Sequence, residues 1–282
     1  LTMFKRKYIL LLVLFSFALL DTNKFKDYEL GRNNDPKTPK DIRAISLFAK
    51  KAMWEVLSLP GMRRMVGMMF PENTVTHINT KQKVVAFTID DGFCGLDNPK
   101  GDMTNKVREL FKKYDAKATF FVTGTHCNHT SKNEILKLIE DGHEIANHSM
   151  YDTPYNNFSY SEFESDFKKT DNILDQYSEN LPKWYRAPHG KFSNTMDKFL
   201  TDQGYTHVMC DAFANDTAIP DPKWISEFIV KKTKPGSILL IHMPEKGVRE
   251  WNYEAMELTL KKITDKGYKI VTFSQLYKLN ID

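Results

Sequence analysis

The sequence has few cysteines, and this excludes a small domain held together by disulfides. Only Cys94, Cys127 and Cys210 occur in a chain of 282 residues, so at most one disulfide can form. Their spacing does not suggest a zinc cluster. Cys94 and Cys127 follow two successive predicted strands, which leaves open either a disulfide between them or free thiols.

The chain also lacks a large excess of charge. Its formal net charge is +4, which is small for this length and does not indicate binding to nucleic acid. Part of this excess lies in the basic cluster Lys5-Arg6-Lys7, close to the start of the sequence.

The apolar run near the start is too short to span a bilayer comfortably. Thirteen uncharged residues, Tyr8 to Leu20, follow the basic cluster, and Ser16-Phe17-Ala18 offers a weak cleavage site. This pattern predicts a secretory signal within residues 1–25, with an uncleaved signal anchor as the alternative. We therefore expect a secreted or cell-surface protein, attached to a membrane only if the anchor is kept.

Four Asn-x-Ser/Thr sequons agree with a secretory route and predict a glycoprotein. They begin at Asn128, Asn147, Asn157 and Asn215. Asn147 lies in a motif described below and should be too buried for glycosylation, so Asn128 and Asn157 are the better candidates.

Residues 26–80 are predicted to form a linker followed by a helical extension. The first part is polar and contains two prolines, whereas residues 42–69 carry apolar residues at helical spacing, interrupted at Pro60-Gly61. We expect two short helices packed against the main domain.

From residue 81 to residue 282 strands and helices alternate, which predicts an α/β domain with a parallel sheet, either open or closed into a barrel. The expected strands are 84–90, 118–122, 144–146, 183–185, 206–210, 238–241 and 269–272. The expected helices between them are 104–114, 132–140, 162–177, 195–202, 224–231 and 254–266.

Polar residues follow the predicted strands where parallel strands place their functional groups. The first strand ends in Asp90-Asp91, and an Asp-Gly turn is the structural alternative there. Asn147-His148 and Asp152, Arg186 to Gly190, Asp211 with Asp216, and His242 follow later strands. Each has an ordinary structural explanation alone, but together they are the components of a metal-assisted hydrolase.

Five ordered segments carry a resemblance: "FTIDDG", "GHEIANHS", "YRAPHG", "ND" and "LLIH". In this order they resemble the motifs of the polysaccharide deacetylases, the NodB-homology or carbohydrate esterase family 4 group. The resemblance implies a distorted (β/α)₇ barrel of NodB type, here with a short N-terminal helical extension. It also implies removal of acetyl groups from N-acetylated polysaccharides or oligosaccharides, such as chitin-like N-acetylglucosamine polymers.

The resemblance assigns acid–base roles to four residues. Asp90 matches the general base that deprotonates the attacking water, and Arg186 matches the arginine that holds it. His242 matches the general acid that protonates the departing amine, and Asp216 the carboxylate that orients this histidine.

Asp91 and His148 match ligands of a divalent ion, for which Zn²⁺ is expected and Co²⁺ or Mn²⁺ are alternatives. The second histidine of the motif is replaced by Asp152, which we expect to be the third ligand; alternatively it faces away and the site is empty. The extra negative charge should favour harder metals.

Pro188, His189 and Tyr155 are expected near the substrate or its oxyanion, with His189 replacing an aromatic residue. Thr217 stands where the family commonly has a tryptophan. A catalytically silent sugar-binding protein is the alternative that Asp152 raises, and a deacylase for another amide is a further one.

Overall fold

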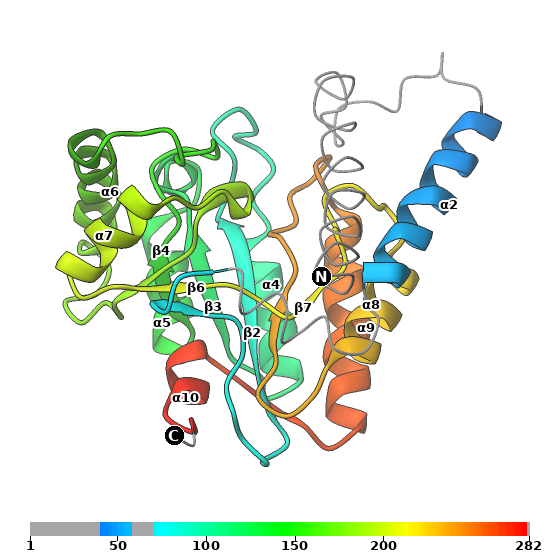
Figure 1. The fold of residues 1–282 in the computed structure, drawn as a ribbon. Helices are drawn as coiled ribbons and strands as arrows, with labels where there is room; N and C mark the ends of the chain where they lie inside the picture. Colours follow the sequence, from blue (N-terminus) through cyan, green and yellow to red (C-terminus); the bar gives the residue numbers. More distant parts are fainter. Residues whose placement is uncertain (1–39, 58–69, 281–282) are drawn as a thin grey trace, which may run out of the picture.

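The computed structural model describes residues 40–57 and 70–280, and a parallel sheet forms its centre (Figure 1). The strand order is β1-β6-β5-β4-β3-β2-β8-β7, and β9 pairs with the beginning of β2. The strands are β1 (Thr74–Val75), β2 (Val84–Gly92), β3 (Ala118–Val122), β4 (Glu144–Asn147), β5 (Trp184–Tyr185), β6 (Thr206–Val208), β7 (Ala212–Phe213), β8 (Ile238–Leu240) and β9 (Lys269–Val271).

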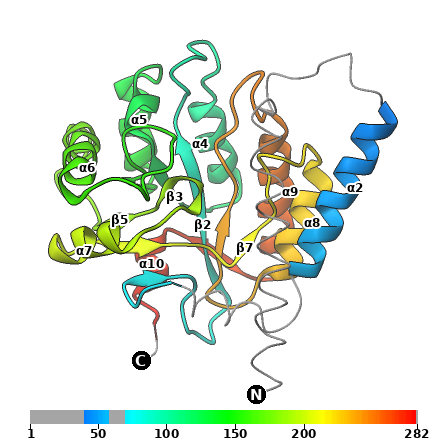
Figure 2. The same cartoon turned by 45° about the horizontal axis from the view of Figure 1, so that its top comes forward.

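Helices follow most strands and cover the sheet (Figure 2). The α-helices are α2 (Lys40–Leu57), α4 (Thr104–Lys113), α5 (Lys132–Glu140), α6 (Tyr160–Leu174), α7 (Asn194–Asp202), α8 (Pro222–Lys232), α9 (Trp251–Asp265) and α10 (Phe273–Tyr277). Two short 3₁₀ helices, η1 (Gly124–Cys127) and η2 (Pro188–Gly190), begin the loops after β3 and β5. The predicted alternation of strands and helices is confirmed.

Strand β2 shows why its sequence is apolar almost throughout: both of its faces are buried. Val85, Phe87 and Ile89 enter the larger core cluster under the helices, whereas Ala86 enters a second cluster inside the curved sheet. Because side chains alternate along a strand, Asp90 continues the row of Ala86. The strand therefore directs the first aspartate of the pair to the inner side of the sheet.

The limits of three predicted helices differ by two or more residues in the structure. Helix α8 begins at Pro222 rather than residue 224. Helix α6 begins at Tyr160 rather than residue 162, because Ser159 and Glu162 form a capping box, and it ends at Leu174 rather than residue 177. Helix α9 begins at Trp251, one turn before the predicted residue 254. The two-residue strands β1 and β7 were not predicted, since so short a segment carries no readable alternation.

The first predicted N-terminal helix is present as α2, and it packs against α8 (Figure 2). Lys51 and Lys231 form ion pairs across this contact, with Asp221 and Glu55 at 2.5 and 2.6 Å. The second predicted helix, the leader and most of the linker lie outside the described residues. Within the part of the chain that the structure describes, no helix has the length and hydropathy needed to cross a membrane.

All three cysteines are free thiols. Of the two possibilities that the sequence left open for Cys94 and Cys127, the structure shows free thiols rather than a disulfide. The sequon at Asn147 is buried, as expected, because its side-chain amide donates a hydrogen bond of 2.8 Å to Asp171 Oδ1. Asn128 and Asn157 are exposed, which leaves their glycosylation a prediction.

Candidate active site

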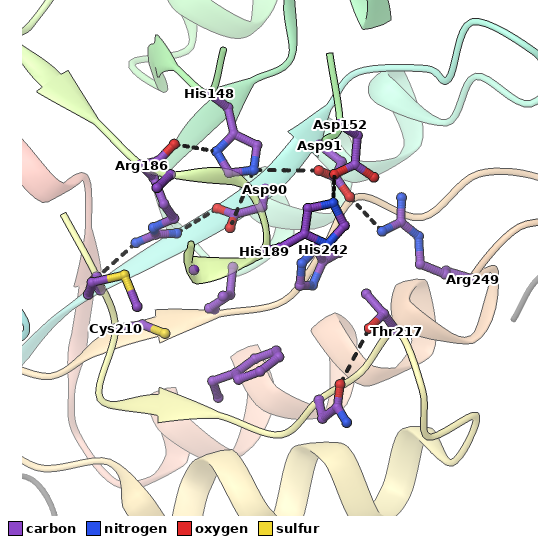
Figure 3. Close-up of a pocket in the computed structure, with 16 residues that line it drawn as sticks. Asp90, Asp91, His148, Asp152, Arg186, His189, Cys210, Thr217, His242 and Arg249 are labelled. Atoms are coloured by element: carbon purple, nitrogen blue, oxygen red, sulfur yellow. Dashed lines mark hydrogen bonds and ion pairs between the residues drawn. The ribbon is translucent and has the colours of Figure 1, made fainter. Parts of the chain in front are cut away.

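The carboxyl ends of the parallel strands surround a cavity of about 500 Å³ (Figure 3). Loops that follow five different strands bring their side chains to it, as expected for an α/β fold. Its lining includes seven predicted site residues, namely Asp90, Asp91, His148, Asp152, Arg186, His189 and His242. The grouping of these residues, which the sequence motifs predicted, is therefore present.

Asp90 is held by Arg186 at the inner side of the sheet. Arg186 Nη1 donates to Asp90 Oδ1 at 2.6 Å and to Thr88 Oγ1 at 2.8 Å. The same guanidinium donates to the carbonyl oxygens of Val208 and Met209. Because both charged side chains are almost fully buried, the pair fixes the position of the carboxylate at the end of β2.

His148 presents one ring nitrogen to the aspartate pair. Its Nδ1 lies 2.8 Å from the carbonyl oxygen of Arg186, and since a carbonyl only accepts, Nδ1 carries the proton. Nε2 then faces Asp91 Oδ1 at 3.6 Å and Asp90 Oδ2 at 3.9 Å. A metal-ligating histidine has this arrangement, with its other nitrogen held by a carbonyl.

Asp91 is paired with an arginine that the sequence motifs did not indicate. Arg249 Nη1 donates to Asp91 Oδ2 at 2.6 Å, and both side chains are largely buried. Burial alone would raise the pKa of Asp91, but Arg249, followed by His242 and His148, lowers it below its ordinary range. The carboxylate is thus charged and already neutralised by a cation of the protein.

Asp152, the expected third ligand, lies at the mouth of the cavity and is paired with His189. Its Oδ1 is 3.1 Å from His189 Nε2, and both side chains are partly exposed. The hydrogen bond that His189 donates to the Asp152 carboxylate raises the pKa of His189, although burial opposes this. Within residues 40–57 and 70–280, no three His, Cys, Asp or Glu side chains form a ready metal site. The structure brings Asp91 and His148 together, and the complete ligand set stays a prediction.

His242, which lines the cavity and is partly buried, pairs with the fully buried Asp216 behind it. Asp216 Oδ1 is 2.9 Å from His242 Nδ1, and Asp216 Oδ2 accepts from the backbone N–H of His242 and from Asn252 Nδ2. Burial disfavours the charged ring, but Asp216 outweighs it, with contributions from Asp91 and Asp90, and raises the pKa of His242 to about 9. The imidazolium form is therefore stabilised at neutral pH.

Two of the three residues expected near the substrate do not line the cavity. Only His189 does; Pro188 is buried in η2. Tyr155 is buried in an aromatic cluster with Phe158 and Phe163, and its hydroxyl donates to Asp166. The position of Tyr155 is that of a core residue, since its polar group already has a buried partner.

Residues with positive φ are concentrated around the cavity. Six described non-glycine residues have positive φ, and all except Asp115 lie in or beside the site: Asp91, Ser149, His189, Asn215 and Arg249. Such conformations cost free energy and cluster at functional sites. Sequence reasoning missed Arg249 because it lies in the irregular loop before α9, seven residues after His242 and outside every recognised motif.

Comparison with known proteins identifies the family. A family model described as polysaccharide deacetylase matches residues 77–208. A peptidoglycan-N-acetylglucosamine deacetylase of Bacillus cereus is 30% identical over 219 residues, which cover 74% of this chain and 95% of that protein. The peptidoglycan-N-acetylmuramic acid deacetylase PdaC of Bacillus subtilis is 28% identical, and the match covers 80% of this chain but 43% of PdaC.

Solved structures share the fold. A peptidoglycan N-acetylglucosamine deacetylase has a TM-score of 0.67 at 22% identity and covers 77% of this chain and 98% of its own. A CE4 family pseudoenzyme from Bacillus anthracis has a TM-score of 0.64 at 22% identity, with 76% and 72% covered. These likenesses confirm the predicted distorted barrel of NodB type. Since an enzyme and a pseudoenzyme match about equally well, the fold alone does not decide activity.

Proposed function

The chain belongs to the polysaccharide deacetylase family, and we propose that it hydrolyses the N-acetyl groups of a polysaccharide that contains N-acetylglucosamine. One observation carries this proposal: a carboxylate held by an arginine, Asp90 with Arg186, faces an imidazole held by a carboxylate, His242 with Asp216, across a single cavity (Figure 3). Amide hydrolysis needs a base on one side of the carbonyl and an acid on the other.

The two pairs divide the proton transfers between them. Asp90, ionised and fixed by Arg186, accepts a proton from the attacking water. His242 carries a proton at neutral pH because Asp216 raises its pKa to about 9. Its Nδ1 is occupied by Asp216, so Nε2 is the atom that donates to the leaving nitrogen. The amine leaves neutral, which makes an otherwise poor leaving group acceptable.

The donors near Asp91 suit a divalent ion in their chemistry. His148 Nε2 faces Asp91 Oδ1, and its Nδ1 is held by a carbonyl as in a ligating histidine. Asp91, His148 and Asp152, the last after turning away from His189, would hold the ion. Imidazole and carboxylate groups are both donors to divalent transition metals, and Zn²⁺, Co²⁺ or Mn²⁺ are the proposed occupants. When bound, the ion would lower the pKa of water and polarise the acetyl carbonyl.

The substrate class rests on the relatives. The deacetylases of Bacillus cereus and Bacillus subtilis named above act on peptidoglycan, a polymer of N-acetylated sugars. We therefore propose peptidoglycan or a chitin-like polymer as substrate, reached outside the cytoplasm. Asp152 and His189 lie at the mouth of the cavity with side chains 43% and 46% exposed, and these would contact the sugar first.

The test is acetate release by the purified full chain from peptidoglycan and from chitooligosaccharides, with Zn²⁺, Co²⁺ or Mn²⁺ added. We expect release from at least one polymer, and release that is at least about 100-fold slower after Asp90→Asn. Failure with every polymer and every metal would contradict the proposal.

A second candidate function is a sugar-binding protein without turnover. It is favoured by the ion pairs of Asp91 with Arg249 and of Asp152 with His189, which hold both carboxylates expected to bind the ion. Oligosaccharide binding by calorimetry, without acetate release under any condition above, would support this alternative.

A further inference from the structure

Arg249 holds a carboxylate that a divalent ion would need. Its Nη1 lies 2.6 Å from Asp91 Oδ2, while the other oxygen of the same carboxylate faces His148 Nε2 at 3.6 Å. The guanidinium and the imidazole thus approach Asp91 from two sides (Figure 3).

The conformation of the loop that carries Arg249 brings this side chain to the cavity. The segment between β8 and α9 folds back on itself through paired backbone hydrogen bonds between Glu245 and Val248. Arg249 follows directly with φ of 52°, a left-handed conformation that a side chain rarely adopts. Helix α9 starts two residues later, at Trp251, whose indole donates to the carbonyl of Asp216.

The pairing of Arg249 is not complete. Among the residues that the structure describes, its buried Nε has no hydrogen-bond partner. A buried donor without a partner weakens the free-energy gain from the pair. A cation that binds Asp91 better can therefore displace the guanidinium.

We propose that Arg249 is an internal competitor of the divalent ion, so that the ion binds only when the Arg249–Asp91 pair opens. This inference rests on the proposed function, in which Asp91 is a ligand. An ion on Asp91 and a guanidinium on the same buried carboxylate would bring two cations into close contact, and their repulsion is poorly screened there. Metal affinity then depends on a residue that is not itself a ligand.

The test compares metal binding by four full-length proteins: the wild type, Arg249→Gln, Arg249→Lys and Lys246→Gln. Lys246 is an exposed cation on the same loop and does not line the cavity. Lys246→Gln therefore lowers the net charge by one, as Arg249→Gln does, without changing the cavity. Arg249→Lys keeps a cation at the position. Each protein is stripped with a chelator and titrated with Co²⁺ without substrate, with binding followed by the visible absorption of the metal.

We expect Arg249→Gln to bind Co²⁺ about tenfold more tightly than the wild type, and Lys246→Gln to match the wild type. Arg249→Lys should lie closer to the wild type than to Arg249→Gln. Adding Asp91→Asn to Arg249→Gln should abolish the gain, which locates the ion at this carboxylate. If Arg249→Gln does not unfold cooperatively and so is not properly folded, the titration is done with Arg249→Met instead.

Equal affinity of the wild type and Arg249→Gln, or a gain that survives Asp91→Asn, would overturn the proposal. Because the titration contains no substrate, its outcome is independent of turnover. An affinity gain without acetate release would refute the proposed function and leave the competition intact.

Discussion

Asp90 and Asp91 are neighbours in the chain, yet their carboxylates bind two different arginines. Asp90 pairs with Arg186 and Asp91 with Arg249, each at 2.6 Å, and the two guanidinium groups lie on different sides of the cavity (Figure 3). The left-handed conformation of Asp91, with φ of 58°, separates the two side chains. Adjacent like charges raise the cost of ionisation, and here each charge has its own buried partner.

Asp90→Asn should lower kcat for acetate release by at least about 100-fold, because the amide cannot accept a proton. The amide oxygen still accepts from Arg186, so the fold should be kept. The measurement is steady-state acetate release together with a thermal unfolding curve.

Asp141→Asn is the matched control, since Asp141 also pairs with an arginine at 2.6 Å but does not line the cavity. Equal losses of activity in both variants would show that the effect of Asp90→Asn is not catalytic.

The activity of the wild type should fall as pH rises through about 9, where His242 loses its proton. Asp216→Asn removes the main charge that raises this pKa, whereas Asp90 and Asp91 still face the ring. We expect the basic limb of the kcat profile to move down by about one pH unit or more. A profile with an unchanged basic limb would mean that His242 is not the acid.

The same pair predicts how stability depends on pH. The pKa of His242 is about 9 in the folded protein against an ordinary 6.5, so the folded state binds the proton more tightly. The resulting stabilisation is fully present below pH 6.5 and is lost as pH rises through 9.

Urea unfolding should therefore show a stability difference between the wild type and His242→Gln that shrinks between pH 6 and pH 10, by an amount on the order of 1–3 kcal/mol. A difference that stays constant over this range would contradict the assignment of the raised pKa.

Asp152→His should raise Zn²⁺ affinity, because it replaces a carboxylate that is held by His189 with an imidazole. We expect a gain of about tenfold, the scale on which groups around a metal change affinity. Asp152→Asn has nearly the same shape and no charge, and it should weaken binding. If neither variant changes the affinity measured by chelator competition, Asp152 is not a ligand.

Trp54→Ala should destabilise the protein by about 2 kcal/mol, since a large ring in contact with the core is lost. Trp54 packs edge-on against Phe213 and Phe228, with ring centroids 5.3 and 6.4 Å apart. Phe48→Ala is the control on the same helix: Phe48 is 75% exposed, and its removal should change stability by less than about 0.5 kcal/mol. Equal effects in denaturant unfolding would show that α2 does not support the domain.

The sequence predicted most strands and the cluster of site residues for one physical reason. Apolar runs such as Val84 to Ile89 mark strands that are buried on both faces, and parallel strands bring the residues after their carboxyl ends to one edge of the sheet. Motifs that are far apart in the chain could thus be expected to meet. This rule does not predict which side chains pair with one another across the cavity.

Arg249 shows the limit of the prediction. It comes from a loop without periodicity, and its conformation depends on the Glu245–Val248 turn and on the start of α9. The resemblance led us to expect Asp152 as a metal ligand and Tyr155 near the substrate. Asp152 does line the cavity, but its carboxylate pairs with His189, and the hydroxyl of the buried Tyr155 donates to Asp166. Side-chain partners across loops depend on three-dimensional packing, which one sequence does not encode in a readable pattern.

The contact of Trp54 with Phe213 matters for anyone who chooses the ends of a recombinant fragment. Phe213 lines the cavity, and its ring centroid lies 5.9 Å from that of His242. The segment matched by the family model, residues 77–208, ends before Phe213. It also excludes Trp54, which packs against Phe213, and His242, which lies beside Phe213 in the cavity. A fragment cut at those limits would keep the aspartate pair and discard the opposite half of the cavity.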